Sequence, residues 1–343
     1  HQACSAHAEE VPAVHVHEGT SCRGVEKGCC DDTPGACLRG TASAQTRWYG
    51  AHMLRSFAPP SPPTSEPALT AVWPHAATRW QRGTQTEDTS PAVTPAATPV
   101  QLAAETPIAL VFNGLSHAVM MATPQDLEAF ALGFALSEGV IDAPEDCRDI
   151  SIEVHTDATA QPSCAVHLEI AARHFARLKE QRRSLAGRTG CGLCGIDSLQ
   201  ALDLCPPALP PTPWCQELDV QHILRPFDTL ASRQALNQRC SALHAAAWAS
   251  PTGELLEVLE DVGRHNALDK LLGHLALAGR LAEPGFVAMT SRASYELVRK
   301  CARLGIPVLA TVSAPTALAV QVAQQAQLQL WGLCRPPSAL RYV

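Results

Sequence analysis

The sequence predicts an α/β fold, and the clearest support lies near its C-terminal end. Apolar runs at 286–290 and 308–312 have the length of buried strands, and the segment 294–304 between them has the apolar spacing of a helix. Gly305 and Pro307 follow that segment, as such residues commonly do at the end of a helix. Strand, helix and strand at this spacing form a parallel crossover unit, and ligands of such folds bind beyond the carboxyl ends of the strands.

Further elements are expected upstream of this unit. Short β-forming runs at 109–112 and 118–121 flank an Asn-Gly pair, which is typical of a two-residue hairpin turn. A helix is predicted to follow directly, with Thr123 as its cap, and the alternation at 165–170 predicts one more strand. Strands and helices therefore occur in mixed order, in keeping with the α/β prediction.

Composition divides the chain near its first third. Residues 1–99 include proline-rich and Thr/Ala-rich runs that cannot bury a core, so a disordered tail is expected there. Residues 100–343 carry periodic apolar segments and are numerous enough for one packed domain. The chain starts at His1 and its first methionine is Met53, which leaves open whether residues 1–52 belong to the native product.

Charge and hydropathy exclude two classes of protein. The net charge of −7 argues against nonspecific nucleic-acid binding, which needs a basic surplus, so any anion site must be local. No apolar run approaches the roughly 20 residues that cross a bilayer, and the first residues lack the features of a signal peptide. We expect a cytoplasmic protein whose thiols are mostly reduced, with neither a nucleic-acid nor a membrane partner.

One loop concentrates reactive sulfur. Cys191 and Cys194 lie in the segment 190–195, where glycine fills three of the other four positions and exposes the thiols. A nearby cation favours the thiolate, and basic residues do lie just upstream, at Lys179, Arg182, Arg183 and Arg188. The pair alone leaves half a zinc site, a redox dithiol and two buried small residues open as alternatives.

A second concentration of polar residues spans 260–270, where six ionisable side chains and an Asn surround one Gly. Three donors follow that glycine, Arg264, His265 and Asn266, and such donors suit phosphate or another anion. The alternative is a solvated helix start that is capped by Asp261, with the last residues of the segment on a wet face.

Several long motifs occur in one order along the chain. They lie at 111–117, 120–124, 136–139, 187–195, 260–270, 290–296 and 312–315. Together they resemble the motifs of the FdhD-type formate dehydrogenase accessory proteins, and the resemblance covers roughly residues 100 to 343.

The resemblance implies a sulfurtransferase. Members of that family accept sulfur as a persulfide from a cysteine desulfurase. They pass it to the molybdenum cofactor, in its bis(molybdopterin guanine dinucleotide) form, before insertion into the formate dehydrogenase catalytic subunit. The first cysteine of the pair carries the persulfide in the family, which corresponds to Cys191, and Cys194 is a candidate partner. The family also implies a homodimer and a cytidine-deaminase-like αβα core, with a smaller lobe at 100–139.

The cofactor is expected to bind along one rim of the sheet. The segments 291–292 and 313–316 each follow a strand, so their N–H groups and Arg292 can meet phosphate there. The alternative for Arg292 is a surface salt bridge with Glu296. The resemblance adds His244 and a C-terminal segment, so the expected cofactor-binding residues are Arg264, His265, Arg292, His244, Leu333, Cys334, Arg335, Pro336, Pro337, Ser338 and Ala339.

The chain departs from the family pattern at two places near this rim. Relatives usually hold a Thr-Gly pair where Cys240 and Ser241 stand, which puts the local turn in question. They also typically hold a glycine and a second basic residue at Pro337 and Ser338. One phosphate contact is therefore expected to be lost, so that the cofactor binds more weakly or uses Arg335 and Arg341 instead.

Two other functions remain as alternatives. His167 and Glu169, ahead of the cysteine pair, superficially copy the motifs of zinc-dependent deaminases. However, no proline precedes Cys191, the two side chains share one side of a strand, and the motif does not account for 260–270. No bound metal is therefore expected. The remaining alternative is a chaperone that holds and delivers the cofactor without a reactive thiol.

Overall fold

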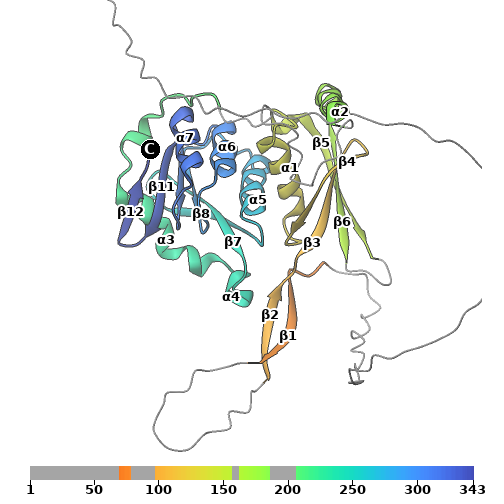
Figure 1. Ribbon diagram of the computed structural model, residues 1–343, viewed down its shortest axis with the longest axis horizontal. Coiled ribbons are helices and arrows are strands. Elements are labelled where there is room, and N and C mark those ends of the chain that lie inside the picture. Colours follow the sequence, from red (N-terminus) through yellow and green to blue (C-terminus); the bar gives the residue numbers. More distant parts are fainter. Residues whose placement is uncertain (1–68, 79–96, 157–161, 186–205) are drawn as a thin grey trace, which may run out of the picture. The chain divides into compact units, whose positions relative to one another are not determined.

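The computed structural model describes residues 69–78, 97–156, 162–185 and 206–343, with only the backbone described at 181–185. These residues form two larger sheets and one two-stranded hairpin (Figure 1). Within these ranges, no helix combines the length and the hydropathy that crossing a bilayer requires.

The first sheet has six strands in the order β12-β11-β10-β9-β7-β8. Their bounds are β7 His244–Ala249, β8 Leu255–Asp261, β9 Phe286–Met289, β10 Val308–Thr311, β11 Gln329–Arg335 and β12 Ser338–Arg341. β9, β10 and β11 are parallel, whereas β7 is antiparallel to both of its neighbours, β8 and β9. The carboxyl ends of β8, β9, β10 and β11 therefore share one edge of the sheet with the first residue of β7.

Helices cover both faces of this sheet. One face packs on α5 Arg264–Leu277, α6 Tyr295–Arg303 and α7 Ala317–Ala326, and the other on α3 Val220–Arg233. Two shorter helical turns, η3 Pro213–Gln216 and α4 Asn237–Cys240, complete this half. The predicted α/β fold and its crossover unit are confirmed, because α6 connects the parallel strands β9 and β10. The likeness to cytidine deaminases stays a prediction.

The second sheet has four strands in the order β4-β3-β6-β5, and α1 Leu127–Ser137 packs on it. The other elements of this part are β3 Thr106–Phe112, β4 Leu115–Ala122, η1 Pro144–Asp146, β5 Cys147–His155, β6 Ser163–Ile170 and α2 Ala172–Leu185. The predicted hairpin turn is confirmed, since Asn113 and Gly114 have φ values of 46° and 77°. The predicted lobe at 100–139 is too short, because β5, β6 and α2 belong to the same core.

The structure also moves the predicted start of the domain. β1 Val72–Thr78 pairs antiparallel with β2 Ala97–Ala103, so one strand lies inside the expected tail and the expected boundary cuts the other. Leu69 packs against the core of the second sheet. The alternation in β1 and β2 is short and interrupted by prolines, and so the composition of the whole segment concealed it. Residues 1–68 and 79–96 lie outside the described ranges.

The two halves meet where α1 crosses α5. A Cβ atom added at Gly133 would lie 1.8 Å from the carbonyl oxygen of Asp269, and one added at Gly273 would lie 1.8 Å from that of Ala129. Only glycine allows the two backbones to approach this closely. The crossing therefore fixes α5, whose first turn lies at the shared edge of the first sheet, relative to the second sheet.

The polar segment 260–270 is mostly buried, which contradicts the alternative of a solvated helix start with its last residues on a wet face. Lys270 and Asp261 are fully buried and form an ion pair of 2.8 Å, and the Lys270 ammonium also donates to the Thr123 carbonyl. Thr123 therefore binds residues of this buried cluster. The prediction that Thr123 caps a helix is wrong, because α1 starts only at Leu127, after Asp126. The side-chain oxygen of Thr123 accepts the N–H of Val262 instead.

Candidate functional site

The shared edge of the first sheet gathers the residues that the sequence marked for binding. We call it the rim and define it by His244, Arg264, His265 and the segments 291–292, 313–316 and 333–339. Arg264, His265 and the segments 291–292 and 313–316 follow the ends of strands, and His244 begins one. The segment 333–339 comprises the end of β11, the turn after it and the start of β12. The structure thus brings all the expected cofactor-binding residues to one edge, including those from opposite ends of the C-terminal half.

Main-chain hydrogen bonds join three segments of the rim. The N–H of Ser313 donates to the Ser291 carbonyl, and the N–H of Leu333 donates to the Ser313 carbonyl, both at 3.3 Å. Gly332 lies beneath this junction, where a Cβ atom would come within 2.9 Å of Pro315. The loops after β9 and β10 and the end of β11 therefore form one continuous backbone surface, as expected for the 291–292 and 313–316 segments.

The first turn of α5 presents Arg264 and His265 at the rim. Asp261 shapes this turn, since one carboxylate oxygen accepts from the Gly263 N–H at 2.8 Å and the Asn266 amide at 3.0 Å. Asn266 also donates to the Met121 carbonyl and is buried, so it is not the third ligand donor that the sequence suggested. Among the described residues, nothing accepts a hydrogen bond from the buried Nε of Arg264.

Glu296 pairs with His265 and not with Arg292. The imidazole Nε2 lies 2.7 Å from a Glu296 carboxylate oxygen, which corrects the alternative of an Arg292–Glu296 salt bridge. Hydrogen bonding from His265 lowers the pKa of Glu296 below its usual value, against the effect of burial, and the charges of His265 and Arg264 add to the lowering. Sequence reasoning missed this pair because 31 positions separate its members, and no local pattern marks it.

Arg292 and His244 complete the basic part of the rim. Arg292 is exposed, and no ion pair to it occurs in the part of the chain that the structure describes. His244 is half-buried, and burial lowers its pKa, helped by the positive charges of Arg264 and His265 and opposed by Asp261. Arginines from α5 and from the loop after β9 therefore converge here with a histidine from β7 whose neutral form is favoured.

The C-terminal segment forms the β11–β12 hairpin, and its side chains divide between surface and core. Arg335 is exposed and donates to the Val312 carbonyl at 3.2 Å, and Leu333, Pro336, Pro337 and Ser338 are also exposed, whereas Ala339 is half-buried. The structure corrects the expectation for Cys334: its side chain is only 1% exposed and packs in the core, so it cannot touch a ligand.

The departures from the family pattern are visible here. Ser241 takes a φ of 53°, a conformation that glycine favours, so the turn before β7 forms despite the missing glycine. Arg341 is exposed; its Nε donates to the Val343 carbonyl and its guanidinium lies over the Trp331 ring, and its part in binding stays a prediction.

The thiols predicted to react, Cys191 and Cys194, lie outside the described residues, as does Arg188. Five cysteines that the structure describes are poor sources of thiolate. Burial raises the pKa of Cys164, raises that of Cys215 to about 11 and raises those of Cys301 and Cys334 to about 12. Burial also raises the pKa of the half-buried Cys147.

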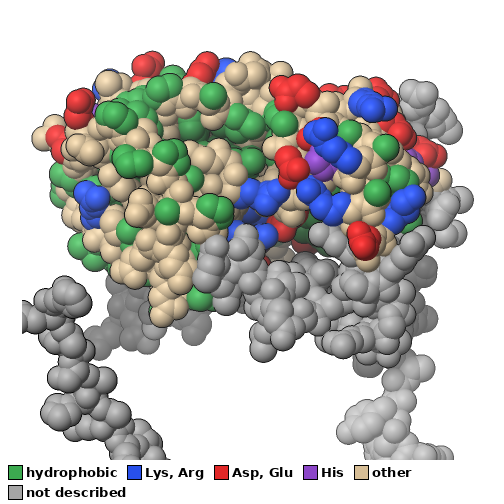
Figure 2. Space-filling view, turned by 90° about the horizontal axis from the view of Figure 1, so that it is seen from above, with side chains coloured by type: hydrophobic (Ala, Val, Ile, Leu, Met, Phe, Trp, Pro, Cys, Tyr) green, Lys and Arg blue, Asp and Glu red, His purple; other side chains and the backbone are tan. Residues whose placement is uncertain are grey.

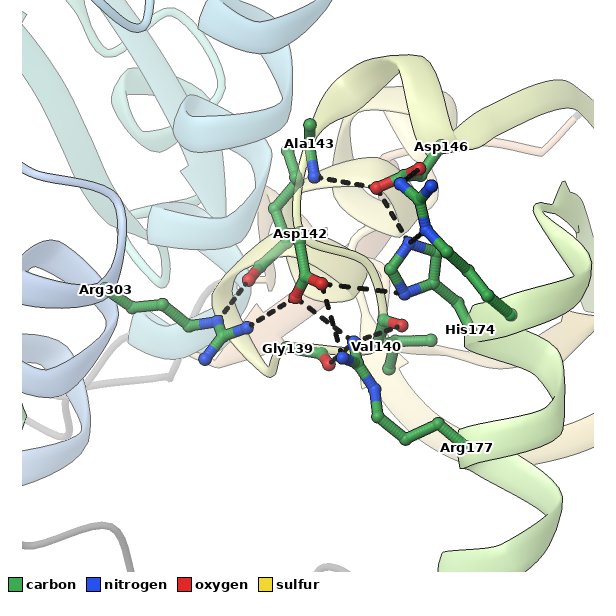
Figure 3. A network of polar contacts seen from close by, with 10 residues as sticks. Gly139, Val140, Asp142, Ala143, Asp146, His174, Arg177 and Arg303 are labelled. Atoms are coloured by element: carbon green, nitrogen blue, oxygen red, sulfur yellow. Dashed lines mark hydrogen bonds and ion pairs between the residues drawn. The ribbon is translucent and has the colours of Figure 1, made fainter.

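The described chain on either side of the cysteine segment is firmly held. Downstream, the N–H of Leu209 donates to the carbonyl of Ala326, just before β11 begins, so this flank lies at the sheet edge opposite the rim. Upstream, α2 is bound by a polar network around Asp142 (Figure 3).

In that network Arg177 of α2 and Arg303 of α6 both pair with Asp142, at 3.2 Å and 3.3 Å, and buried His174 lies 2.8 Å from Asp146. On the face seen from above, basic and acidic side chains likewise lie next to one another (Figure 2).

The residues behind the deaminase alternative lie in the second sheet. His167 on β6 is 3.3 Å from Glu153 of β5, and Glu169 is exposed on the same strand. Within the described ranges, no three His, Cys, Asp or Glu side chains are grouped as a metal site requires. The geometry therefore gives this alternative no support among the described residues.

Comparison with known proteins agrees with these observations. A protein of Burkholderia cenocepacia named sulfur carrier protein FdhD is 52% identical over 238 residues, which cover 69% of this chain and 85% of the relative. Proteins of the same name from Chromobacterium violaceum and Cupriavidus necator are 52% and 49% identical, covering 71% and 78% of this chain and 88% and 86% of the relatives.

A solved structure from Desulfotalea psychrophila, of a protein assigned as a formate dehydrogenase accessory protein, is 22% identical. It has a TM-score of 0.54 and covers 79% of this chain and 96% of the other. That likeness shows the shared fold. The model of the FdhD/NarQ family matches residues 103–343. The chain therefore belongs to the FdhD/NarQ family.

Proposed function

We propose that this protein is a sulfur carrier that serves formate dehydrogenase. Cys191 takes sulfur from a cysteine desulfurase and delivers it to the molybdenum cofactor, as bis(molybdopterin guanine dinucleotide), held at the rim. The names of the relatives support the sulfur carrier role. The rim itself supports an anionic ligand: among the described residues, Arg264, Arg292 and Arg335 form no ion pair with a carboxylate, in a chain of net charge −7.

Two helix starts strengthen this binding proposal. The residues before α5 and α6, Gly263 and Ser294, make no side-chain capping hydrogen bond, so the first N–H groups of both helices have no partner from these caps. Such N–H groups, together with the positive end of the helix, favour phosphate. The pyrophosphate of a guanine dinucleotide is therefore the chemistry that best fits the rim.

The loading step is a thiol exchange in which the chain supplies the nucleophile. The Cys191 thiolate attacks the outer sulfur of the desulfurase persulfide, a new S–S bond forms on Cys191, and the desulfurase leaves as its thiolate. In the second step the outer sulfur leaves Cys191 as sulfane sulfur, the Cys191 thiolate keeps the electron pair of the broken S–S bond, and the molybdenum cofactor would supply the two electrons that reduce the transferred sulfur to sulfide. Cys194 is close enough in sequence to exchange with the same persulfide.

Chain length permits the loaded sulfur to reach the rim. Pro206, the first described residue after Cys194, comes twelve positions later in the sequence, and an extended chain of that length spans at most about 40 Å. The seven-residue strand β11, which crosses the sheet, is about 23 Å long. The reach therefore exceeds the distance across the sheet, although the downstream flank lies at the opposite edge.

Persulfide trapping tests the sulfur carrier role directly. The protein is incubated with a desulfurase and cysteine, alkylated, digested and examined by mass spectrometry, with Cys191→Ala and, as control, Cys147→Ala. We expect label at Cys191 in the wild-type and control proteins. Wild-type protein that binds the cofactor without any persulfide would favour the alternative of a chaperone with no reactive thiol.

Nucleotide binding tests the rim, with GDP in place of the guanine dinucleotide. A charge-assisted contact contributes roughly 1.5 to 3 kcal/mol, so Arg264→Ala or Arg292→Ala should weaken GDP binding about 10- to 150-fold. Arg280→Ala is the matched control, because Arg280 lies just beyond the other end of α5, paired with Glu257. Persulfide loading should be unchanged in all three. Unaltered GDP binding by both rim variants would contradict this placement.

The proposal extends to partners and location. A cysteine desulfurase and the catalytic subunit of formate dehydrogenase are the expected protein partners, the functional state is expected to be a homodimer, and the location cytoplasmic. Copurification with either partner and the mass of the protein in solution would test these expectations.

A further inference from the structure

One acidic side chain lies among the cations of the rim. Glu296, in the first turn of α6, holds Nε2 of His265 at 2.7 Å, and the Ser294 hydroxyl lies 3.4 Å from the same carboxylate oxygen. The Glu296 side chain is 37% exposed, so it lies at the surface that a ligand would approach. A carboxylate at this position is unexpected in a site that favours anions, because its negative charge repels an anionic ligand.

Burial alone would favour the protonated form of Glu296, yet its surroundings favour the anion. The hydrogen bond from His265 and the positive charges of His265 and Arg264 hold the pKa of this carboxyl below its usual value. The interaction is mutual, because Glu296 also stabilises the positive charges of His265 and Arg264. A second anion close by would compete with Glu296 for the same two positive groups. Glu296 therefore opposes binding of any phosphate that contacts those two residues.

We propose that Glu296 is an internal counter-ion of the rim, which occupies His265 in the empty protein and weakens the hold on the anionic cofactor so that it is released. This inference rests on the proposed binding of the cofactor at the rim. A carrier must give up its cargo, and arginines without an acidic neighbour would retain a pyrophosphate more tightly. Glu296 would thus set the lifetime of the complex.

Glu296→Gln isolates the charge. Glutamine has the same shape and retains an oxygen that accepts from His265, so the ring keeps its orientation while the negative charge is lost. Glu257→Gln is the matched control. Glu257 pairs with Arg280 and lies 3.6 Å from His274 near the other end of α5, so its substitution changes the net charge equally but far from the rim.

The experiment measures the affinity and the release rate of a fluorescent GDP analogue by titration and stopped flow, with inorganic pyrophosphate as a competitor that lacks the base. Glu296→Gln should bind both roughly 5- to 50-fold more tightly at low salt, mainly through slower release, and the gain should shrink at 0.5 M salt. Glu257→Gln should resemble the wild-type protein.

The outcomes separate this inference from the proposed function. Wild-type binding with unchanged or weaker binding by Glu296→Gln would overturn the counter-ion role and leave the rim in place; weaker binding would mean that the charge serves the ligand. Equal tightening by Glu257→Gln would show only an effect of net charge and would also overturn it. If the wild-type protein binds neither probe, both the rim and this inference fail, whereas persulfide labelling still decides the sulfur step.

Discussion

Replacing Glu138 by Gln removes one of two carboxylates that face a buried lysine. Glu138 follows α1, and its carboxylate lies 2.8 Å from the Lys300 ammonium and 2.6 Å from the Arg299 guanidinium on α6. Lys300 also pairs with buried Asp269 of α5 at 2.8 Å and donates to Ser137. The cluster therefore joins α1, α5 and α6, the helices that connect the two halves of the fold.

The magnitude follows from the acidity of Glu138. Burial raises its pKa, but the charges of Lys300 and Arg299 outweigh this and bring the pKa from 4.5 down to about 2. A difference of that size between the unfolded and folded states corresponds to about 3 kcal/mol of stability. Because the folded pKa is the lower one, this contribution is complete above about pH 5 and is lost as the pH falls from 4.5 towards 2.

Chemical denaturation of Glu138→Gln and wild-type protein checks this prediction. We expect the variant to be less stable by about 3 kcal/mol at pH 7, with the difference shrinking steadily below pH 4.5. Glu283→Gln is the control, because Glu283 pairs with Arg280 at the surface, where such pairs contribute less than about 1 kcal/mol. A stable Glu138→Gln protein, or a deficit that persists unchanged at pH 3, would refute the reasoning.

Three further predictions concern other parts of the chain. Gly273→Ala should lower the stability by about 3 kcal/mol or more, seen in thermal unfolding, because the new Cβ would meet the Ala129 carbonyl; an unchanged melting temperature would show that α1 can move aside. Cys301 and Cys334 should resist iodoacetamide at pH 8 until the protein unfolds, since burial raises their pKa to about 12, and rapid labelling found by mass spectrometry would contradict this. Deleting residues 1–52 should alter neither the unfolding curve nor persulfide loading, because the described core contacts start at Leu69; a change in either measurement would assign that segment a role.

Local signals explain what the sequence could predict of the fold. The strands at 286–290 and 308–312 were recognised because a buried strand is short, apolar and bounded by turn residues, and the hairpin because Asn-Gly can take the backbone conformation of its turn. The buried partners of 260–270 could not be recognised in this way. Thr123 contacts Asp261 across 138 positions of sequence, and nothing within a short window indicates that Lys270 is enclosed.

The candidate site was predictable in part, for the same reason. Residues directly after parallel strands must meet at one edge, so Arg292 and Ser313 could be placed together from the order of the elements. The pairing of His265 with Glu296 depends on how α6 is rotated against α5, and the burial of Cys334 depends on the twist of the last hairpin. These are properties of packing, which the order of the elements does not determine.

The main-chain bonds of the rim separate its shape from its charge. Main-chain N–H and carbonyl groups join Ser291, Ser313 and Leu333. Every amino acid carries both groups in its main chain, except proline, which lacks the N–H. Side chains along the same edge can therefore be exchanged during evolution while the surface on which a ligand rests keeps its form. If the rim binds phosphate as proposed, proline and serine at 337 and 338 change how strongly it attracts that ligand but leave the main-chain bonds of Ser291, Ser313 and Leu333 in place.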